Sequence, residues 1–176
     1  MIVRQERPED RTAVFALHTA AFGAPDQADV PEARLVDLLR AAGDTVPELS
    51  LVALAADAPD DGAAIVGHVT CSRAVLGDRA SLGLGPLGVR PDVQRRGVGQ
   101  ALMHAVLGAA EALGAPAVVL LGDPAYYARF GFVAAEPLGI RAPDPAWGPH
   151  FQVRRLSAWD PGLRGPFRYA DAFSQL

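Results

Sequence analysis

Arginines and glycines stand directly before an apolar, helix-like run in the segment QRRGVGQALM (94–103). The first backbone amides of a helix have no acceptor within the helix and, together with its dipole, form a binding site for anions. Gly97 and Gly99 lack a Cβ, so a phosphate can approach the backbone closely, and Arg95 and Arg96 can add charge-assisted hydrogen bonds. The segment therefore predicts a pyrophosphate site. A plain helix start with two solvated arginines is the alternative.

Two common phosphate-binding motifs do not match this segment well. A P-loop requires Gly-Lys-Ser/Thr, and the chain has no lysine, since all 16 basic residues are arginine. A Rossmann motif would have a third glycine where Leu102 stands and a tight turn where seven residues separate Val89 from Gly97. Asp123, near the place of a ribose-binding acid, is what favours a Rossmann-type nucleotide enzyme, which we keep as an alternative.

Other residues with reactive side chains give weaker signals. Cys71 has no activating partner nearby in sequence and is expected to be a small buried hydrophobe. The four histidines show no metal-ligand spacing with Cys or acids, so we predict no metal site. His68 lies in a strand-like segment and is expected to be a polar core residue, with a catalytic role as the alternative. Asp123 is expected to cap the helix that follows it.

The elements that must position these residues follow from hydrophobic patterning and from turn residues. A length of 176 residues, half of them hydrophobic, suggests one domain over 1–158 and a tail, 159–176, that packs on it through its aromatic residues. Helices are expected to begin near residues 8, 29, 97 and 124. Strands are expected within 2–4, 49–56, 64–75, 81–89, 117–122, 132–135 and 151–158.

The segment LGVRPDVQRRGVGQALM (87–103) resembles the acetyl-CoA motif of the GNAT N-acetyltransferases. Gln94, Gly97 and Gly99 fill the Gln/Arg-x-x-Gly-x-Gly/Ala positions of that motif. YYARFGF (126–132) resembles a later segment of the family, in which a tyrosine stands four residues before a Gly-Phe pair, as Tyr127 does here. Together with PELSLVA, IVGH and the aromatic tail, the resemblance covers nearly the whole chain and is strongest to the YhbS-like subgroup of predicted acetyltransferases.

The resemblance implies an α/β (α+β) fold with a mixed, mostly antiparallel sheet of six to seven strands, splayed at the centre and flanked by about four helices. SLGLGPLGV (81–89) fits the splayed strand, because Pro86 cannot donate to a ladder and glycines permit a bulge. Its backbone would pair with pantetheine amides, and the Val89 amide would be an oxyanion donor. The implied CoA-binding residues are Leu87, Gly88, Val89, Gln94, Arg95, Arg96, Gly97, Val98, Gly99 and Gln100.

The implied reaction is direct attack of a primary amine on acetyl-CoA. Tyr127 is the expected acid for the leaving thiolate, whereas Tyr126, about 100° round the helix, is expected to pack elsewhere. A lysine-like amine has a pKa of about 10.4 and must lose a proton. Residues 81–89 contain no acid, so His68, Asp123 and a water chain are all open as the base. The missing base motivates the alternative of a non-catalytic acyl-CoA-binding or regulatory module.

The expected acceptor is a small-molecule or peptide amine, framed, by resemblance, by the loops 23–31 and 136–150. The aromatic residues Trp147, Trp159, Tyr169 and Phe173 either line that site or pin the tail, and we favour the second role.

Charge and hydropathy limit the other partners. A net charge of -4 argues against a nucleic-acid partner. The apolar run APAVVLL is too short to span a bilayer, and the N-terminus lacks the apolar core of a signal peptide. With a single cysteine, the chain is expected to be cytoplasmic. Because many relatives dimerise, the resemblance also leaves a homodimer open.

Overall fold

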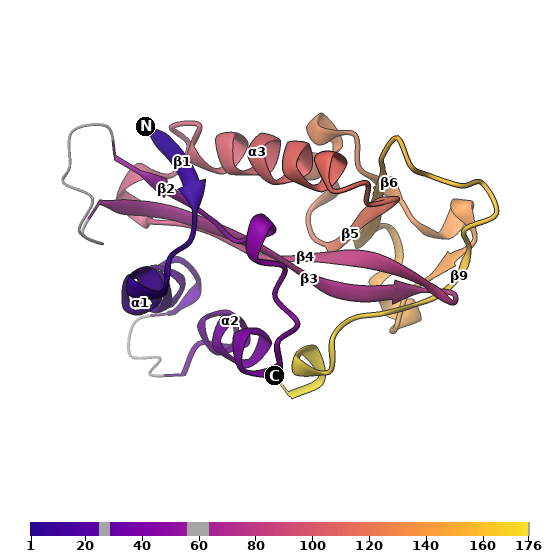
Figure 1. Ribbon diagram of the computed structural model, residues 1–176, viewed down its shortest axis with the longest axis horizontal. Helices are drawn as coiled ribbons and strands as arrows, with labels where there is room; N and C mark the ends of the chain where they lie inside the picture. Colours follow the sequence, from indigo (N-terminus) through magenta and orange to yellow (C-terminus); the bar gives the residue numbers. More distant parts are fainter. Residues whose placement is uncertain (25–28, 56–63, 176) are drawn as a thin grey trace.

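The computed structural model describes residues 1–24, 29–55 and 64–175. Helices cover both faces of one mixed sheet (Figure 1). The α-helices are α1 (Arg11–Phe22), α2 (Pro31–Ala42), α3 (Val98–Ala112) and α4 (Pro124–Tyr127). The 3₁₀ helices are Pro8–Asp10, Pro47–Leu49, Pro91–Val93, Ala128–Phe130, Glu136–Leu138, Pro145–His150 and Asp171–Gln175.

Within the described residues the sheet has nine strands: β1 (Ile2–Gln5), β2 (Leu51–Leu54), β3 (Ile65–Leu76), β4 (Arg79–Val89), β5 (Ala117–Leu121), β6 (Val133–Ala134), β7 (Ile140–Arg141), β8 (Phe151–Arg155) and β9 (Gly165–Arg168). Their order is β1-β2-β3-β4-β5-β8-β6, with β9 beside β3 and β7 beside β9. Only the β4–β5 and β7–β9 pairings among them are parallel. The expected mixed, mostly antiparallel sheet is confirmed, and the additional strands come from the loop 136–150 and the tail.

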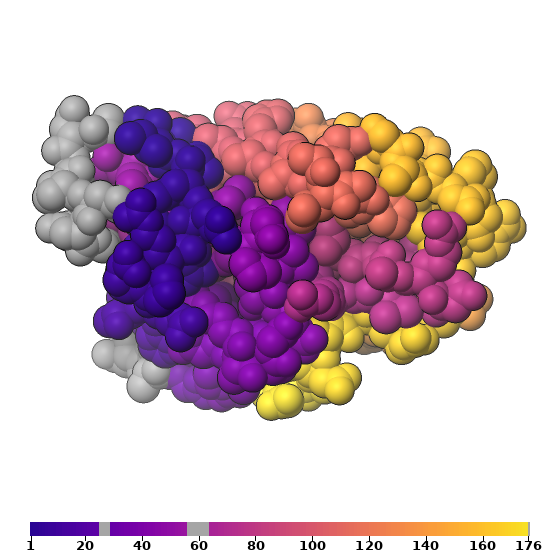
Figure 2. Space-filling model, in the orientation of Figure 1, coloured from indigo at the N-terminus to yellow at the C-terminus, as the bar shows by residue number. Residues whose placement is uncertain are grey.

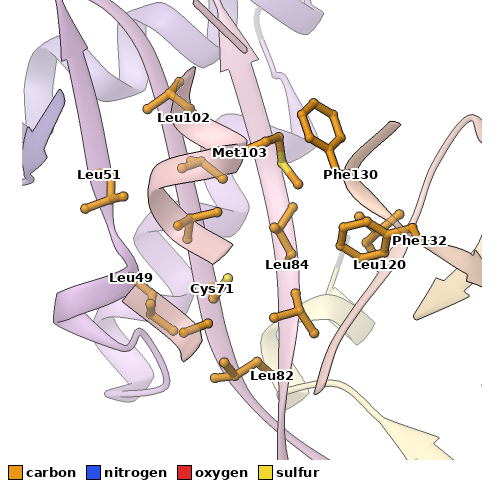
Figure 3. Packing of buried hydrophobic residues seen from close by; sticks show 14 of the residues in the cluster. Leu49, Leu51, Cys71, Leu82, Leu84, Leu102, Met103, Leu120, Phe130 and Phe132 are labelled. Atoms are coloured by element: carbon orange, nitrogen blue, oxygen red, sulfur yellow. The ribbon is translucent and has the colours of Figure 1, made fainter. Parts of the chain in front are cut away.

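The helix α3 lies on one face of the sheet, and α1 and α2 lie on the other (Figure 1). Leu102, Val106 and Ala110 are four residues apart on α3 and are fully buried, as expected for the apolar stripe of a helix on a sheet. Figure 3 shows the core between α3 and the strands, where Met103 and Phe130 lie beside Leu84 of β4. In the part of the chain that the structure describes, no helix is both long enough and apolar enough to cross a membrane.

The central strands β4 and β5 separate after a short parallel contact. They pair at Leu82↔Val118 and Gly83↔Val119, whereas β4 stays paired with β3 to its end at Gly67↔Val89. The last residues of β4 therefore have a strand partner on one side only. This is the splay expected for the segment 81–89, and it exposes a backbone edge directly before the loop that leads into α3.

The tail forms a strand where an irregular segment was expected. Val75 and Leu76 pair with Arg168 and Phe167 of β9. This edge of β3 is free because β2 ends at its pairing of Leu51 with Val69. The last 3₁₀ helix then contacts α2, and the space-filling view shows the yellow C-terminal residues against it (Figure 2).

Candidate active site

A cavity of about 550 Å³ lies where the end of β4 meets the beginnings of α3 and α4. We call it the β4–α3 cavity. Its wall is formed by Ala21, Phe22, Leu87, Gly88, Val89, Gln94, Arg95, Gly97, Gly99, Gln100, Tyr126, Tyr127 and Arg129. The size is typical of a small-molecule or cofactor site.

The loop before α3 has the conformation of an anion cradle. Gly97, the N-cap of α3, has a φ of 87°, and Arg95 has a φ of 61°, which is uncommon for a residue with a Cβ. The first intrahelical bond of α3 runs from the Ala101 amide to the Gly97 carbonyl at 3.0 Å. The amides of Val98 and Gly99 therefore precede that ladder and are free of acceptors within the helix.

The free edge of β4 presents the backbone groups of alternate residues. The Arg90 amide donates to the Val66 carbonyl at 3.0 Å, and bonded and non-bonded pairs alternate in an antiparallel ladder. Val89 and Leu87 are therefore in non-bonded pairs, and their backbone groups point away from β3. The Gln94 side chain donates to the Val89 carbonyl at 3.1 Å, so the Val89 amide is the group that this residue still offers to a ligand.

The structure brings eight of the ten expected CoA-binding residues to the wall of the β4–α3 cavity and leaves two outside it. Arg96 is exposed and does not line the cavity. The Val98 side chain is buried in the core beneath α3, so only its backbone faces the loop. The catalytic candidates Val89 and Tyr127 both line the cavity.

Tyr126 and Tyr127 both line the cavity, so the expectation that Tyr126 packs elsewhere is wrong. The helix α4 has a single turn, and two adjacent long side chains at its end can both reach one opening. Their rings meet edge to face with centroids 4.9 Å apart. Burial, and then the neighbouring Tyr126, raises the pKa of Tyr127 to about 12. Its hydroxyl is therefore protonated at neutral pH.

A second cavity of about 390 Å³ shares Phe22, Leu87 and Tyr127 with the first. We call it the aromatic cavity. The rest of its lining is Glu32, Leu35, Leu84, Gly85, Pro86, Leu121, Trp147, Tyr169 and Phe173. Among these lining residues, Glu32 is the one that carries a charge at neutral pH.

The four aromatic residues named for the acceptor site or for the tail differ in their surroundings. Trp147, Tyr169 and Phe173 pack against one another and also line the aromatic cavity, whereas Trp159 lines neither of these two cavities. The loop 136–150 contributes Trp147. Of the loop 23–31, residues 25–28 lie outside the described residues.

A buried polar network under β4 was not found from the sequence. The His18 Nε2 and His68 Nδ1 atoms are 2.8 Å apart, and the His68 Nε2 atom is 3.1 Å from the Ser50 Oγ and 3.3 Å from a Glu6 carboxylate oxygen. Both imidazoles are fully buried. The one sequence signal was that His18 follows Leu17 on the apolar face of α1, where a polar residue needs a partner.

Two other candidates have structural roles. The Asp123 carboxylate accepts from the Ala125 amide at 2.9 Å, which confirms that Asp123 caps α4. Cys71 is fully buried in the core beneath α3, and burial raises the pKa of its thiol. A thiol in this environment is inert, as expected.

Comparison with known proteins gives consistent results over nearly the whole chain. Residues 51–134 match the model of the acetyltransferase (GNAT) domain. The chain is 35% identical over 167 residues to the uncharacterized N-acetyltransferase YhbS of Escherichia coli, which covers 94% of this chain and 92% of YhbS. It is 31% identical over 170 residues to YjhQ of the same species, another uncharacterized N-acetyltransferase.

Solved structures show the same similarity. The crystal structure of E. coli YhbS in complex with CoA superposes with a TM-score of 0.85 at 33% identity, over 98% of this chain and 91% of that one. A GNAT family acetyltransferase from Brucella melitensis in complex with acetyl-CoA superposes with a TM-score of 0.75 at 32% identity, over 98% of this chain and 97% of that one.

Proposed function

Because the chain belongs to the GNAT N-acetyltransferase family, we propose that it transfers an acetyl group from acetyl-CoA to a primary amine. Its relatives are named N-acetyltransferases, and the chain is an acyltransferase. The proposal rests mainly on one observation: the β4–α3 cavity is lined both by the free backbone edge of β4 and by the free amides at the start of α3. Such a pair of surfaces suits a ligand with amides at one end and a pyrophosphate at the other.

The residues of the β4–α3 cavity fit CoA in their chemistry. The backbone groups of Leu87 and Val89 would pair with the pantetheine amides, as an added strand pairs with a sheet edge. The amides at the start of α3 and the Arg95 guanidinium would hold the pyrophosphate. Gly99 allows the Tyr126 hydroxyl to lie against the start of α3, since a Cβ there would meet that hydroxyl at 2.7 Å.

The chemistry that we propose needs two groups beside the thioester. The Val89 amide would stabilise negative charge on the carbonyl oxygen. Tyr127 would protonate the sulfur as the C–S bond breaks and the new C–N bond forms. Tyr127 suits this role because its hydroxyl is still protonated when the enzyme meets its substrates.

The aromatic cavity is where we propose that the amine binds. It shares Leu87 and Tyr127 with the β4–α3 cavity, so an amine bound there would lie next to the proposed position of the thioester. Its walls are aromatic and aliphatic, and Glu32 gives it one negative charge. We therefore expect a compact amine with an apolar or aromatic body, such as phenylethylamine, to be acetylated more efficiently than spermidine or a lysine peptide.

The first test is the melting temperature with acetyl-CoA, CoA and NAD in parallel. Saturation at about 100 times Kd adds roughly 2.7 kcal/mol, which is a shift of about 5–10 °C for a chain of this size. We expect the shift with both CoA ligands and not with NAD. A shift with NAD alone would contradict the proposal, and CoA binding without acetylation of any amine in a panel would favour the non-catalytic alternative.

A further inference from the structure

The proposed reaction needs a residue that accepts the proton lost by the amine, and none has been assigned above. The surroundings of Gly88 contain a candidate. Gly88 is on the wall of the β4–α3 cavity. A Cβ at this position would meet the His18 Nδ1 atom at 2.7 Å and its Cε1 atom at 2.9 Å. The space that a side chain of β4 would fill is therefore occupied by an imidazole from α1. Phe22, which lines the same cavity, stacks on that imidazole with a centroid distance of 5.8 Å.

The hydrogen bonds of the network determine which imidazole nitrogens carry protons. The Ser50 hydroxyl donates its one proton to the Glu6 carboxylate at 2.5 Å. The Ser50 oxygen and the carboxylate can then only accept, so the His68 Nε2 atom must carry a proton. Its Nδ1 atom is consequently bare and accepts from the His18 Nε2–H.

The same reasoning leaves a free lone pair at the end of the network. The His18 Nδ1 atom is bare, and among the described residues it has no hydrogen-bond partner. A buried polar atom without a partner is costly unless it serves a purpose. This atom lies against Gly88, directly behind the wall of the cavity in which the reaction would occur.

The other end of the network reaches a different opening. Glu6 and Ser50 line a cavity of about 490 Å³, which we call the Glu6 cavity. It shares no lining residue with the β4–α3 cavity or with the aromatic cavity. Arg40 pairs with the Glu6 carboxylate and lines this cavity too. The network therefore runs from the back of the cavity wall at Gly88 to a separate cavity.

We propose that His18 accepts the proton that the acceptor amine must lose, and that His68 and Glu6 conduct this proton to the Glu6 cavity. The Nδ1 atom of His18 would take the proton through a water that enters beside Gly88, while the Nε2 proton of His18 passes to His68. The Nε2 proton of His68 passes in turn to the Glu6 carboxylate and then to solvent. An ammonium loses two protons on its way to an amide. The first leaves through this network, and the second returns to the Tyr127 oxygen, which has given its own proton to the CoA sulfur, so that one proton reaches solvent for each turnover.

The charges around the imidazoles favour their neutral form, in which the network can work. Burial lowers the pKa of His18 well below its usual value, and His68 and Arg40 lower it further. Burial also lowers the pKa of His68, although Glu6 and, more weakly, Asp10 oppose that change and Arg40 adds to it. Burial would raise the pKa of Glu6, but its contacts with His68, Ser50 and Arg40 outweigh burial and keep it ionised.

A kinetic experiment separates this role from a structural one. We expect His18→Gln and Glu6→Gln to lower kcat at pH 7, His18→Gln by about 100-fold, the usual contribution of a general base. The deficit should shrink as pH rises toward the amine pKa of about 10.4, because the solution then supplies unprotonated amine. His104→Gln, an exposed histidine on α3, is the matched control and should keep the wild-type profile.

The same variants must bind acetyl-CoA with an unchanged thermal shift, which shows that the fold is intact. A deficit of equal size at every pH would overturn the proposal. If His18→Gln does not fold, Glu6→Gln, whose shape is conserved, carries the kinetic test alone.

Nitrogen-15 NMR of labelled histidine tests the network without any acetyl transfer. We expect His18 and His68 to be neutral Nε2–H tautomers that do not titrate between pH 8 and 6, where an ordinary histidine with a pKa of about 6.5 does. An Nδ1–H tautomer at His18 would overturn the proposal. The inference rests on the proposed function, but the two can fail separately: absence of acetylation by the wild type would contradict the function, whereas a wrong tautomer would contradict only the relay.

Discussion

Tyr127 and Tyr126 differ in burial although they are neighbours on α4. Burial raises the pKa of both, and it raises that of Tyr127 further, to about 12. A raised pKa keeps a phenol protonated as pH rises, so the wild-type kcat should show no loss from ionisation of Tyr127 up to about pH 10.

We expect Tyr127→Phe to lower kcat about 100-fold with the KM for acetyl-CoA within about twofold. Tyr126→Phe should retain at least about tenfold more activity, and equal losses would argue against the acid role.

Gly99 and Gly108 provide a matched pair on α3. A Cβ at Gly99 would meet the Tyr126 hydroxyl at 2.7 Å, whereas a Cβ at Gly108 would have no heavy atom within 4 Å. We expect Gly99→Ala to weaken acetyl-CoA binding at least about tenfold, because Tyr126 must move into the cavity. Gly108→Ala should bind normally and gain roughly 0.5–1 kcal/mol of stability. Titration calorimetry and thermal unfolding of both variants check this, and normal binding by Gly99→Ala would contradict it.

Individual residues were predictable from sequence where their partners are near in the chain. Asp123 caps α4 through the amide of Ala125, two residues away, and turn chemistry of this kind is local. His18 was missed because His68, its partner, is 50 residues away. The hydrogen bonds that assign its tautomer exist only after β3 pairs with β4 and α1 packs on them.

At the scale of elements, one ion pair fastens β1 to the beginning of α1. The Asp10 carboxylate accepts from two Arg4 nitrogens at 2.7 and 3.0 Å, and from the Arg7 amide at 2.7 Å. The side chains are 2% and 15% exposed for Asp10 and Arg4, so solvent does not replace these bonds easily. Hydrogen bonding from Arg4 is the main reason that the pKa of Asp10 lies below its usual value.

We expect Asp10→Asn to lower the free energy of unfolding at pH 7 by about 1–3 kcal/mol. A carboxylate with a depressed pKa stabilises the fold above its unfolded pKa of about 3.9, and this contribution is lost as pH falls through the folded pKa. The difference between wild type and variant should therefore shrink below about pH 4. Asp78→Asn, at an exposed turn, should change stability by less than about 0.5 kcal/mol. Denaturant unfolding of the wild type and of Asp10→Asn at several pH values tests this prediction. A difference in stability that does not change with pH would contradict it.

Long elements were predictable from the sequence and short ones were not. The apolar spacing on α3 and the strand-like run of β4 predicted both elements, and the resemblance to the GNAT family implied the splay between β4 and β5. The strands β6 and β7 have two residues each, which is too short for a hydrophobic period to appear. Their existence depends on neighbours supplied by β8 and β9.

At the scale of the whole molecule, the tail connects the sheet to the cavity walls. Phe167 is 1% exposed and contacts Phe151 and Tyr169 edge to face. We expect Phe167→Ala to cost about 3–5 kcal/mol, or roughly 6–20 °C of melting temperature. Phe15→Ala is the control, because Phe15 is 40% exposed on α1, and it should cost under about 1 kcal/mol. A small effect of Phe167→Ala would mean that β9 contributes little to the fold.

The strand in the tail could not be predicted from the sequence of the tail, because it pairs with an edge of β3 that β2 leaves unpaired. Nothing in residues 165–168 requires a strand, and Pro166 disfavours one. The position exists because β2 is shorter than β3, a fact about chain segments more than 90 residues away. The aromatic residues of the tail predicted that it packs on the body, whereas the lining of a cavity by Tyr169 and Phe173 was only the less favoured alternative.

The β4–α3 cavity and the aromatic cavity share Phe22, Leu87 and Tyr127 and otherwise have different linings. If acetyl-CoA and the amine occupy them as we propose, each reactant has a binding surface of its own and the two meet at Leu87 and Tyr127. For steady-state kinetics we then expect a ternary complex: initial-rate lines should intersect when either concentration is varied, the free acetylated amine should compete with the amine, and CoA should compete with acetyl-CoA.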